Sequence, residues 1–227
     1  MCLKYGKFSM ILVTGGAGYI GSHTALTLID AGREVVIIDN LVNSTTSSIK
    51  AIGKITGKSV NFINGDLRSE NFLRLIFSKY KITDVIHFAG LKSVGESNLS
   101  PVYYYENNVT GTLNLIKVMG ESGCKNLLFS SSATVYGQPE NLPIKESFPL
   151  SATNPYGQSK LFIEKVLSDT KKSDDQWNIV VLRFFNPAGA HSSGLLGENS
   201  PSKPSNLFPL ISRVAAGHFS HLEVFGG

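Results

Sequence analysis

A tyrosine and a lysine in Tyr156-Gly-Gln-Ser-Lys160 stand at a spacing that places both side chains on one face of a helix. A free phenol has a pKa near 10, and lowering it to about 7 requires roughly 4 kcal/mol of stabilisation of the phenolate. A neighbouring ammonium group and an oxidised, positively charged nicotinamide would both act in that direction. The pattern therefore predicts Tyr156 as a proton-transfer group and Lys160 as its electrostatic partner, although Y-x-x-x-K also occurs on ordinary surface helices.

Other polar side chains follow two apolar segments on either side of this pair. Ser132 closes the segment 125–132 and Thr134 comes shortly after it, so these hydroxyls could bond a sugar hydroxyl and relay its proton, Ser132 in the main role. Asn186 follows the segment 178–185 and offers both donors and acceptors to a polar substrate. The alternatives are hydroxyls that bond their own backbone and a plain Asn-Pro turn.

A glycine-rich turn follows the apolar residues 10–14, and Gly15, Gly16, Gly18 and Gly21 satisfy both G-x-G-x-x-G and G-x-x-G-x-x-G. Glycines at these positions permit a tight turn and a close approach of the backbone to a pyrophosphate. The following helix directs its free N–H groups at the phosphates. The motif predicts a dinucleotide site, and alone it is weak because such turns occur in unrelated folds.

Two acidic residues strengthen this interpretation. Asp39 ends the apolar segment 34–39, 18 positions after Gly21, near the spacing at which an acid accepts a hydrogen bond from the ribose of NAD. A carboxylate there would repel the 2′-phosphate of NADP, so we expect NAD; the alternative is a solvated aspartate at the start of a loop. Asp66 ends another such segment and could flank an adenine ring together with Leu67, or cap the helix that follows.

Apolar segments and amphipathic segments alternate along the chain. We expect strands at 10–14, 34–39, 59–66, 83–90, 125–132 and 178–185, and helices at 19–28, 49–55, 70–79, 101–119 and 154–170. This alternation predicts an α/β fold with a doubly wound parallel (Rossmann-type) sheet, which binds ligand beyond the carboxyl ends of its strands.

We divide the chain into three parts on this basis. Residues 1–9 are expected to be a disordered extension, 10–185 an NAD-binding domain, and 186–227 the start of a smaller substrate-binding lobe. In the last part the composition changes to Pro, Ser and Gly, with a short helix at 207–216 and a short strand at 222–225.

Composition excludes several classes of protein. The 227 residues carry a net charge of +4 without a Lys/Arg block, which suits an anionic small substrate better than nucleic acid. No apolar run approaches the ~20 residues of a membrane helix. Cys2 and Cys124 do not make a disulfide framework, so we expect a cytoplasmic location. The five histidines have no metal-ligand spacing, and we expect no metal site.

In order along residues 10–227, these segments resemble the extended short-chain dehydrogenase/reductase family, and within it the 4-epimerases of UDP-glucose and UDP-galactose. The matching segments are 13–24, 39–41, 65–66, 87–92, 107–109, 129–137, 156–160 and 183–191. The resemblance implies a resident NAD, a UDP-hexose substrate and a catalytic set of Tyr156, Lys160 and Ser132. Tyr156 would take the proton of the sugar 4-hydroxyl while hydride leaves C4, and the transient 4-keto sugar would turn over and accept the hydride on its other face.

The resemblance also assigns contacts residue by residue. It implies NAD contacts at Gly15, Gly18, Tyr19, Ile20, Asp39, Asn40, Asn43, Asp66, Leu67, Phe88, Ala89, Lys92 and Asn107, in addition to the motif residue Gly21 and the Tyr156–Lys160 pair. It implies substrate contacts at Ser132, Tyr156, Asn186, Asn206, Leu207, Val224 and Phe225. Members of the family usually pair as homodimers through helices that here correspond to 104–119 and 156–167.

Two departures limit what the resemblance implies. Related nucleotide-sugar 4,6-dehydratases carry an acidic pair where this chain has Ala133 and Thr134, which cannot perform that acid–base step. The family continues past residue 227, so we expect an incomplete substrate lobe and no useful activity from these residues alone. The alternatives are a decarboxylase or 4-reductase on the same scaffold, or an inactive NAD-binding fragment.

Overall fold

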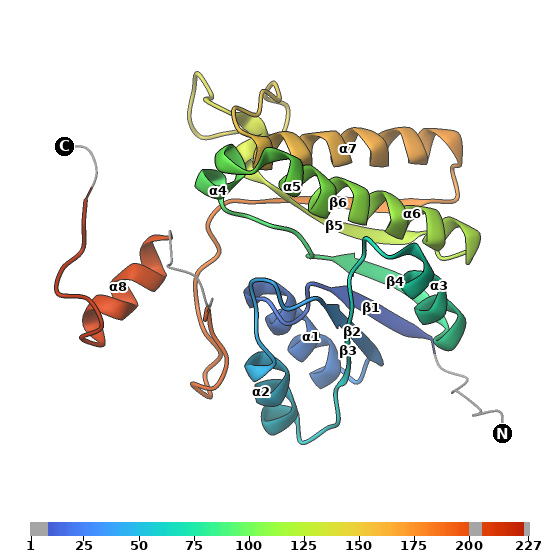
Figure 1. Ribbon diagram of the computed structural model, residues 1–227, viewed down its shortest axis with the longest axis horizontal. Helices are drawn as coiled ribbons and strands as arrows, with labels where there is room; N and C mark the ends of the chain where they lie inside the picture. The colour runs from blue at the N-terminus through green and yellow to red at the C-terminus, as the bar shows by residue number, and fades with distance from the viewer. Residues whose placement is uncertain (1–8, 200–205, 225–227) are drawn as a thin grey trace.

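Six parallel strands form the centre of the protein in the computed structural model, which describes residues 9–199 and 206–224 (Figure 1). The strands are β1 (Met10–Thr14), β2 (Val35–Asp39), β3 (Asn61–Asn64), β4 (Ile82–His87), β5 (Asn126–Ser132) and β6 (Asn178–Phe184). Their order is β3-β2-β1-β4-β5-β6, so the direction of winding reverses between β1 and β4. This order confirms the predicted doubly wound sheet, in which ligands bind at that reversal.

Helices cover both faces of the sheet. One face carries α1 (Tyr19–Asp30) and α2 (Ser47–Thr56), and the other carries α3 (Glu70–Lys79), α6 (Gly111–Glu121) and α7 (Pro155–Ser173) (Figure 1). Two shorter helices, α4 (Val94–Leu99) and α5 (Pro101–Tyr105), pack beside α7. None of the helices in the described residues is long and apolar enough to cross a membrane.

The core consists of two apolar layers, one on each side of the central strands. Leu12 and Phe129 are fully buried on the side of α3, α6 and α7, whereas Val13 and Ile37 are fully buried on the side of α1 and α2. Successive residues of a strand point to opposite faces, so β1 contributes to both layers. Burial on both faces explains why β1 and β2 are nearly continuous apolar runs.

The predicted helix 101–119 is continuous in space but changes its winding midway. A π-helical segment, η1 (Glu106–Thr110), separates α5 from α6. Within this segment Asn107 lines the large pocket described below, while Asn108 is buried. Single π turns inside α-helices are frequent at functional sites, and here the wider turn accompanies the different placement of two adjacent asparagines.

The chain leaves the sheet after β6 in an extended segment and then forms α8 (Leu207–Ala215), which lies apart from the sheet and buries none of its residues (Figure 1). The helix prediction for this region is confirmed. The strand expected at 222–225 does not form at 222–224, because these residues pair with no described strand; Phe225 lies outside the described residues, as do residues 1–8. The division of the chain at residue 186 stays a prediction.

Candidate active site

A pocket of about 620 Å³ extends along the carboxyl ends of the strands, across the reversal between β1 and β4. It is lined by the following residues predicted from the sequence: Gly15, Gly18, Tyr19, Ile20, Gly21, Asp39, Asn40, Asn43, Asp66, Leu67, Phe88, Ala89, Lys92, Asn107, Ser132, Thr134, Tyr156, Lys160, Asn186 and Asn206. The dinucleotide motif and the tyrosine–lysine pair therefore share one pocket. Leu207 and Val224 are exposed and do not line it, and Phe225 lies outside the described residues.

The glycine turn brings its backbone against the loop after β4. Gly15 has φ of 67°, and a Cβ atom there would lie only 2.5 Å from the backbone nitrogen of Ala89. A Cβ on Gly21 would overlap the carbonyl oxygen of Gly15. No side chain caps the first turn of α1, which begins after Gly18. The result is a cradle of bare backbone at a helix N-terminus, which fits a pyrophosphate.

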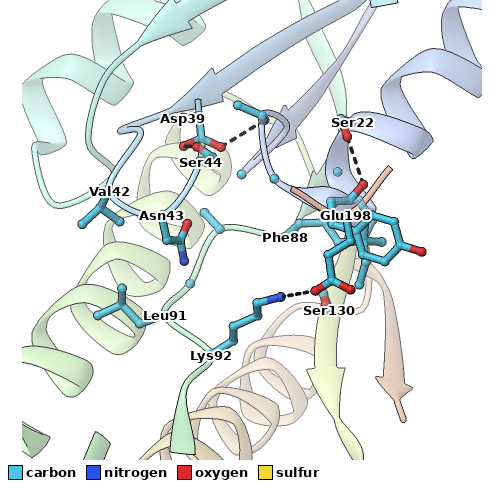
Figure 2. A pocket seen from close by; sticks show the side chains of 18 of the residues that line it. Ser22, Asp39, Val42, Asn43, Ser44, Phe88, Leu91, Lys92, Ser130 and Glu198 are labelled. Carbon is cyan, nitrogen blue, oxygen red and sulfur yellow. Dashed lines mark hydrogen bonds and ion pairs between the residues drawn. The ribbon is translucent and has the colours of Figure 1, made fainter. Parts of the chain in front are cut away.

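Asp39 lies at the end of β2 and is only 8% exposed (Figure 2). Its Oδ2 accepts a hydrogen bond from the backbone of Ala17 at 3.0 Å, and its Oδ1 accepts from the backbone of Leu41 and the hydroxyl of Ser44, both at 2.9 Å. A carboxylate has roughly four acceptor positions, so one remains for a ligand hydroxyl. The carboxylate both fixes the neighbouring loops and faces the pocket, rather than being merely solvated.

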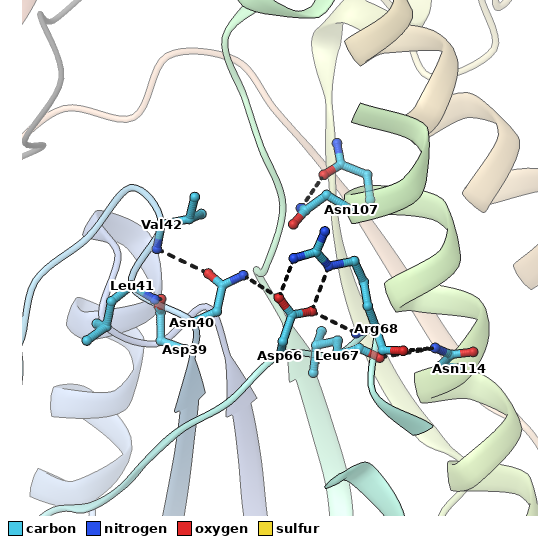
Figure 3. A network of polar contacts seen from close by, with 10 residues as sticks. Asp39, Asn40, Leu41, Val42, Asp66, Leu67, Arg68, Asn107 and Asn114 are labelled. Atoms are coloured by element: carbon cyan, nitrogen blue, oxygen red, sulfur yellow. Dashed lines mark hydrogen bonds and ion pairs between the residues drawn. The ribbon is translucent and has the colours of Figure 1, made fainter. Parts of the chain in front are cut away.

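Asp66 belongs to a polar network at the next strand end (Figure 3). Arg68 donates to both of its carboxylate oxygens at 3.0 and 2.8 Å, and Asn40 donates at 3.0 Å. The hydrogen bond from Arg68 holds the pKa of Asp66 well below its usual range, which keeps the carboxylate charged. The cap of α3 is Ser69 and not Asp66, since the Ser69 hydroxyl accepts from the Phe72 backbone at 3.3 Å. The contact of Asp66 with an adenine ring stays a prediction.

The segment after β6 closes one wall of the pocket. The hydroxyl of Tyr19 donates to the carbonyl of Gly189 at 2.7 Å, and Lys92 forms an ion pair with Glu198 at 3.3 Å (Figure 2). Leu196 anchors the segment in the apolar layer beside α1. Sequence reasoning missed Glu198, because nothing in the Ser/Gly-rich pattern of 186–199 indicates which residue turns inward.

Lys160 is 5% exposed in the middle of α7, which begins where Asn154 accepts a hydrogen bond from the Gly157 backbone at 2.9 Å. The ammonium group donates to the carbonyl of Ser130 at 2.8 Å and lies 4.9 Å from the centre of the Phe129 ring. Burial lowers the pKa of Lys160 to about 8, so the group remains largely charged at neutral pH.

Tyr156 lines the same pocket one helical turn earlier. Burial raises the pKa of its phenol, and a hydrogen bond with Ser132 partly opposes that shift. The phenol is therefore protonated in the protein without a bound cofactor. A base at this position needs an additional positive charge near the phenol, which is what an oxidised nicotinamide would provide.

The hydroxyl of Ser132 takes part in local hydrogen bonds, and its predicted role toward a sugar hydroxyl stays a prediction. It accepts from the backbone and the hydroxyl of Thr134 at 3.2 and 3.0 Å, which caps the short 3₁₀ helix η2 (Ala133–Tyr136). Both residues also line the pocket. Because Ser132 accepts these bonds, its own proton remains available to Tyr156 or to a ligand.

Asn108 and His87 are buried and position the site without lining it. The side-chain amide of Asn108 donates to the carbonyl of Leu91 at 3.0 Å and to Ser159 at 3.2 Å, while its oxygen accepts from the Leu91 backbone at 2.8 Å. This residue thus ties the loop that carries Lys92 to the helix that carries Tyr156. The sequence contains no separate signal for it beyond two asparagines inside an otherwise apolar helical pattern.

His87 closes β4 and is 1% exposed. Thr112 donates to the carbonyl of Asn108 at 2.6 Å, so it must accept from Nε2 of His87 at 2.8 Å, and Nδ1 then accepts from Thr14 at 2.6 Å. Burial lowers the pKa of His87 to about 3, which fits this neutral form. The residue joins β1, β4 and α6.

The chain resembles curated epimerases along almost all of its length. It is 54% identical over 216 residues to UDP-glucose 4-epimerase of Dictyostelium discoideum, and 52% identical over 219 residues to UDP-glucose 4-epimerase 2 of Arabidopsis thaliana. Each alignment covers 95% of this chain and 63% of the relative. The chain therefore spans less than two thirds of the length of these relatives.

Solved structures show the same relationship. UDP-glucose 4-epimerase of Bifidobacterium longum, in complex with NAD⁺ and UDP, superposes with a TM-score of 0.92 at 48% identity over 96% of this chain and 65% of that one. The Stenotrophomonas maltophila enzyme, with bound NAD and formylated UDP-arabinopyranose, superposes with a TM-score of 0.93 at 44% identity, over the same shares of the two chains.

A family model matches residues 11–227, which include the glycine turn, the strand-end carboxylates and the Tyr156–Lys160 pair. The match covers far more than half of the chain, and it joins elements that the fold brings into one pocket. The chain belongs to the NAD dependent epimerase/dehydratase family.

Proposed function

We propose that the protein is an NAD-dependent epimerase that inverts C4 of a UDP-hexose, UDP-glucose or UDP-galactose. The observation that carries the proposal is the continuity of one pocket from the backbone cradle at Gly15 to the Tyr156–Lys160 pair. The relatives at 52–54% identity are UDP-glucose 4-epimerases, and two solved structures of similar fold contain NAD.

The residues present fit NAD. Gly15 and Gly21 permit a close backbone packing that a Cβ at either position would block, which leaves bare backbone at the start of α1 for a pyrophosphate, and Asp39 keeps an acceptor position for the ribose. A buried carboxylate at this position opposes a 2′-phosphate, so NAD is preferred over NADP. Asn40, Asp66 and Leu67 would hold the adenosine, and Lys92 and Asn107 would contact other parts of the cofactor; all five residues line the pocket.

NAD supplies a hydride acceptor and donor for C4 of the sugar when it is bound. Tyr156 removes the proton of the 4-hydroxyl as the 4-keto sugar forms, and returns it after the sugar has turned over. Ser132 bonds the same oxygen, and Thr134 orients Ser132. The ammonium group of Lys160 stabilises the phenolate of Tyr156, and Asn186 contacts the sugar nucleotide from the opposite wall. Leu207, Val224 and Phe225 stay predicted substrate contacts.

Decarboxylation or 4-reduction on the same scaffold is the alternative reaction. Either would change the net oxidation state or the carbon count of the sugar, whereas epimerisation changes neither. Net consumption or release of NADH for each product formed reveals a reduction or an oxidation, and a product lighter by one CO₂ reveals a decarboxylation.

We also propose that the protein forms a homodimer. Leu99, Val102, Tyr105 and Phe162 are apolar side chains exposed on α4, α5 and α7, helices that pack against one another. A second copy would cover this face. Sedimentation or light scattering measures the mass, and Val102→Glu is expected to yield monomers; a monomeric wild-type protein would contradict the proposal.

Conversion of UDP-galactose to UDP-glucose tests the proposed reaction in a purified form that extends over the length of the relatives, because residues 1–227 alone are expected to have no useful activity. NAD is added first, and the two sugars are separated by chromatography. We expect interconversion to the same equilibrium mixture from either sugar, with no net NADH. Binding of NAD and UDP without any conversion, under conditions in which a relative is active, would contradict it.

A further inference from the structure

An ion pair next to Lys160 consists of residues that do not line the pocket. Glu164 is one helical turn after Lys160 on α7, and Arg183 is on β6. The guanidinium donates to both carboxylate oxygens, with Nη2 to Oε2 at 2.7 Å and Nε to Oε1 at 3.0 Å. The Glu164 side chain is 9% exposed and that of Arg183 is 21% exposed, so solvent screens this pair far less than a surface pair.

The pair reaches two further elements. The hydroxyl of Ser131 on β5 donates to Oε1 of Glu164. Nη1 of Arg183 donates to the hydroxyl of Tyr136 at 2.8 Å, and the guanidinium lies 4.9 Å from the centre of the same ring. One carboxylate and one guanidinium thus connect α7, β5, β6 and η2. These four segments carry, or directly precede, every residue of the proposed catalytic set.

Besides connecting these segments, the carboxylate of Glu164 acts on the pKa of Lys160. The Lys160 side chain faces the Phe129 ring and the Ser130 carbonyl from β5, and the neutral His87 from β4. On α7, Tyr156 and Glu164 lie one helical turn before and one helical turn after Lys160. Burial lowers the pKa of Lys160, and the Glu164 carboxylate acts in the opposite direction.

We propose that Glu164 and Arg183 are a positioning pair for the Tyr156–Lys160 couple, in which the carboxylate keeps the Lys160 ammonium charged and the guanidinium holds the four segments in register. The role in turnover rests on the proposed function, whereas the effect on Lys160 does not. Stability alone is a weak reason for such a pair, because well-packed apolar residues often replace a buried ion pair without loss.

Two single variants separate the electrostatic role from a structural one. Glu164→Gln and Arg183→Met break the same ion pair but remove charges of opposite sign. We expect the pKa of Lys160 to fall by about one unit in Glu164→Gln and to rise or stay unchanged in Arg183→Met. Loss of a structural contact alone would shift both variants in the same direction.

Nuclear magnetic resonance of the lysine side chains, titrated with pH in the NAD-bound protein without sugar, measures these shifts, and Lys160→Met identifies the signal. Asp169→Asn is the matched control, since it removes an exposed carboxylate that pairs with Lys165 on the same helix. It should leave Lys160 unchanged. The double variant Glu164→Gln/Arg183→Met leaves no unpaired buried charge, so it serves if a single variant does not fold; the pKa of Lys160 should fall there too.

Turnover provides the second readout. We expect both single variants to lower kcat by about 10-fold with little change in KM, because neither residue lines the pocket. An unchanged pKa of Lys160 in folded Glu164→Gln and in the double variant would overturn the proposal. The pKa of Lys160 could shift in opposite directions in the two single variants while neither wild type nor any variant epimerises the sugar. That result would support the effect of the pair on Lys160 and contradict the proposed function.

Discussion

Asn in place of Asp39 is the sharpest perturbation of cofactor choice that the structure offers. Three donors face the carboxylate of Asp39 in the wild type. An asparagine amide has an NH₂ group in place of one carboxylate oxygen, so this group must point at one of those donors. The least costly orientation places it opposite the Ala17 backbone and keeps the oxygen toward Leu41 and Ser44. One hydrogen bond to a charged acceptor is then lost, about 1.5–3 kcal/mol.

The same substitution acts on stability and on binding. For a protein of this size that loss lowers Tm by roughly 3–12 °C. A similar loss at the ribose weakens NAD binding by about 10–100-fold. The affinity for NADP should fall less than the affinity for NAD, or should rise, because the repulsion of the 2′-phosphate disappears. The preference for NAD should therefore fall by at least about 10-fold.

Calorimetric titration of wild type and Asp39→Asn with both cofactors measures the effect. Ser44→Ala is the control, since it removes one donor to Asp39 and leaves the charge in place. It should lower Tm slightly and keep the preference for NAD. The reasoning is wrong if wild type binds NADP as tightly as NAD, or if the ratio is the same in Asp39→Asn.

Three further substitutions test other parts of the account. Tyr156→Phe should leave NAD binding intact and slow epimerisation by about 10²–10⁴-fold, as measured by product formation; near-normal turnover would remove the phenol from the mechanism. Asn108→Leu leaves both backbone groups of Leu91 unpaired, so Tm and NAD affinity should fall together, and a loss of only one would contradict its positioning role. His87 stays neutral in the fold down to about pH 3 but is protonated in the unfolded chain below about pH 6.5, so the unfolded state binds more protons in that range. The free energy of unfolding should therefore rise by up to about 1.4 kcal/mol per pH unit in that range. Urea titrations at several pH values measure this rise, which should be smaller in His87→Gln than in wild type. In the loop variant His191→Gln the rise should not be smaller.

The sequence was sufficient for the sheet because burial on both faces leaves a simple pattern. Each inner strand has an apolar segment, and each is followed by or ends in residues of the pocket. The glycine turn, Asp39 and the Tyr156–Lys160 pair could be predicted because their chemistry restricts residue type as well as spacing, whereas most other pocket residues were assigned only through the family resemblance. The expected strand at 222–225 had only local propensity in its favour, and residues 222–224 find no partner in the described sheet.

Residues that act through others were out of reach of the sequence. Asn108 matters because a π turn directs it toward Leu91 and Ser159, and a 3.6-residue period cannot reveal that turn. Glu164 and Arg183 lie 19 positions apart and meet only after β6 pairs with β5. Such contacts depend on tertiary packing, which local patterns do not contain.

The spectrum of the nicotinamide after addition of UDP-galactose to the NAD-bound protein tests the central claim most directly. The claim is that the cradle at Gly15 and the Tyr156–Lys160 pair serve one reaction. The account predicts that reduced nicotinamide forms transiently in wild type, and far more slowly in Tyr156→Phe, which binds NAD and sugar equally well. Equal rates of reduction in the two proteins, or bound sugar with no reduction in wild type, would contradict it.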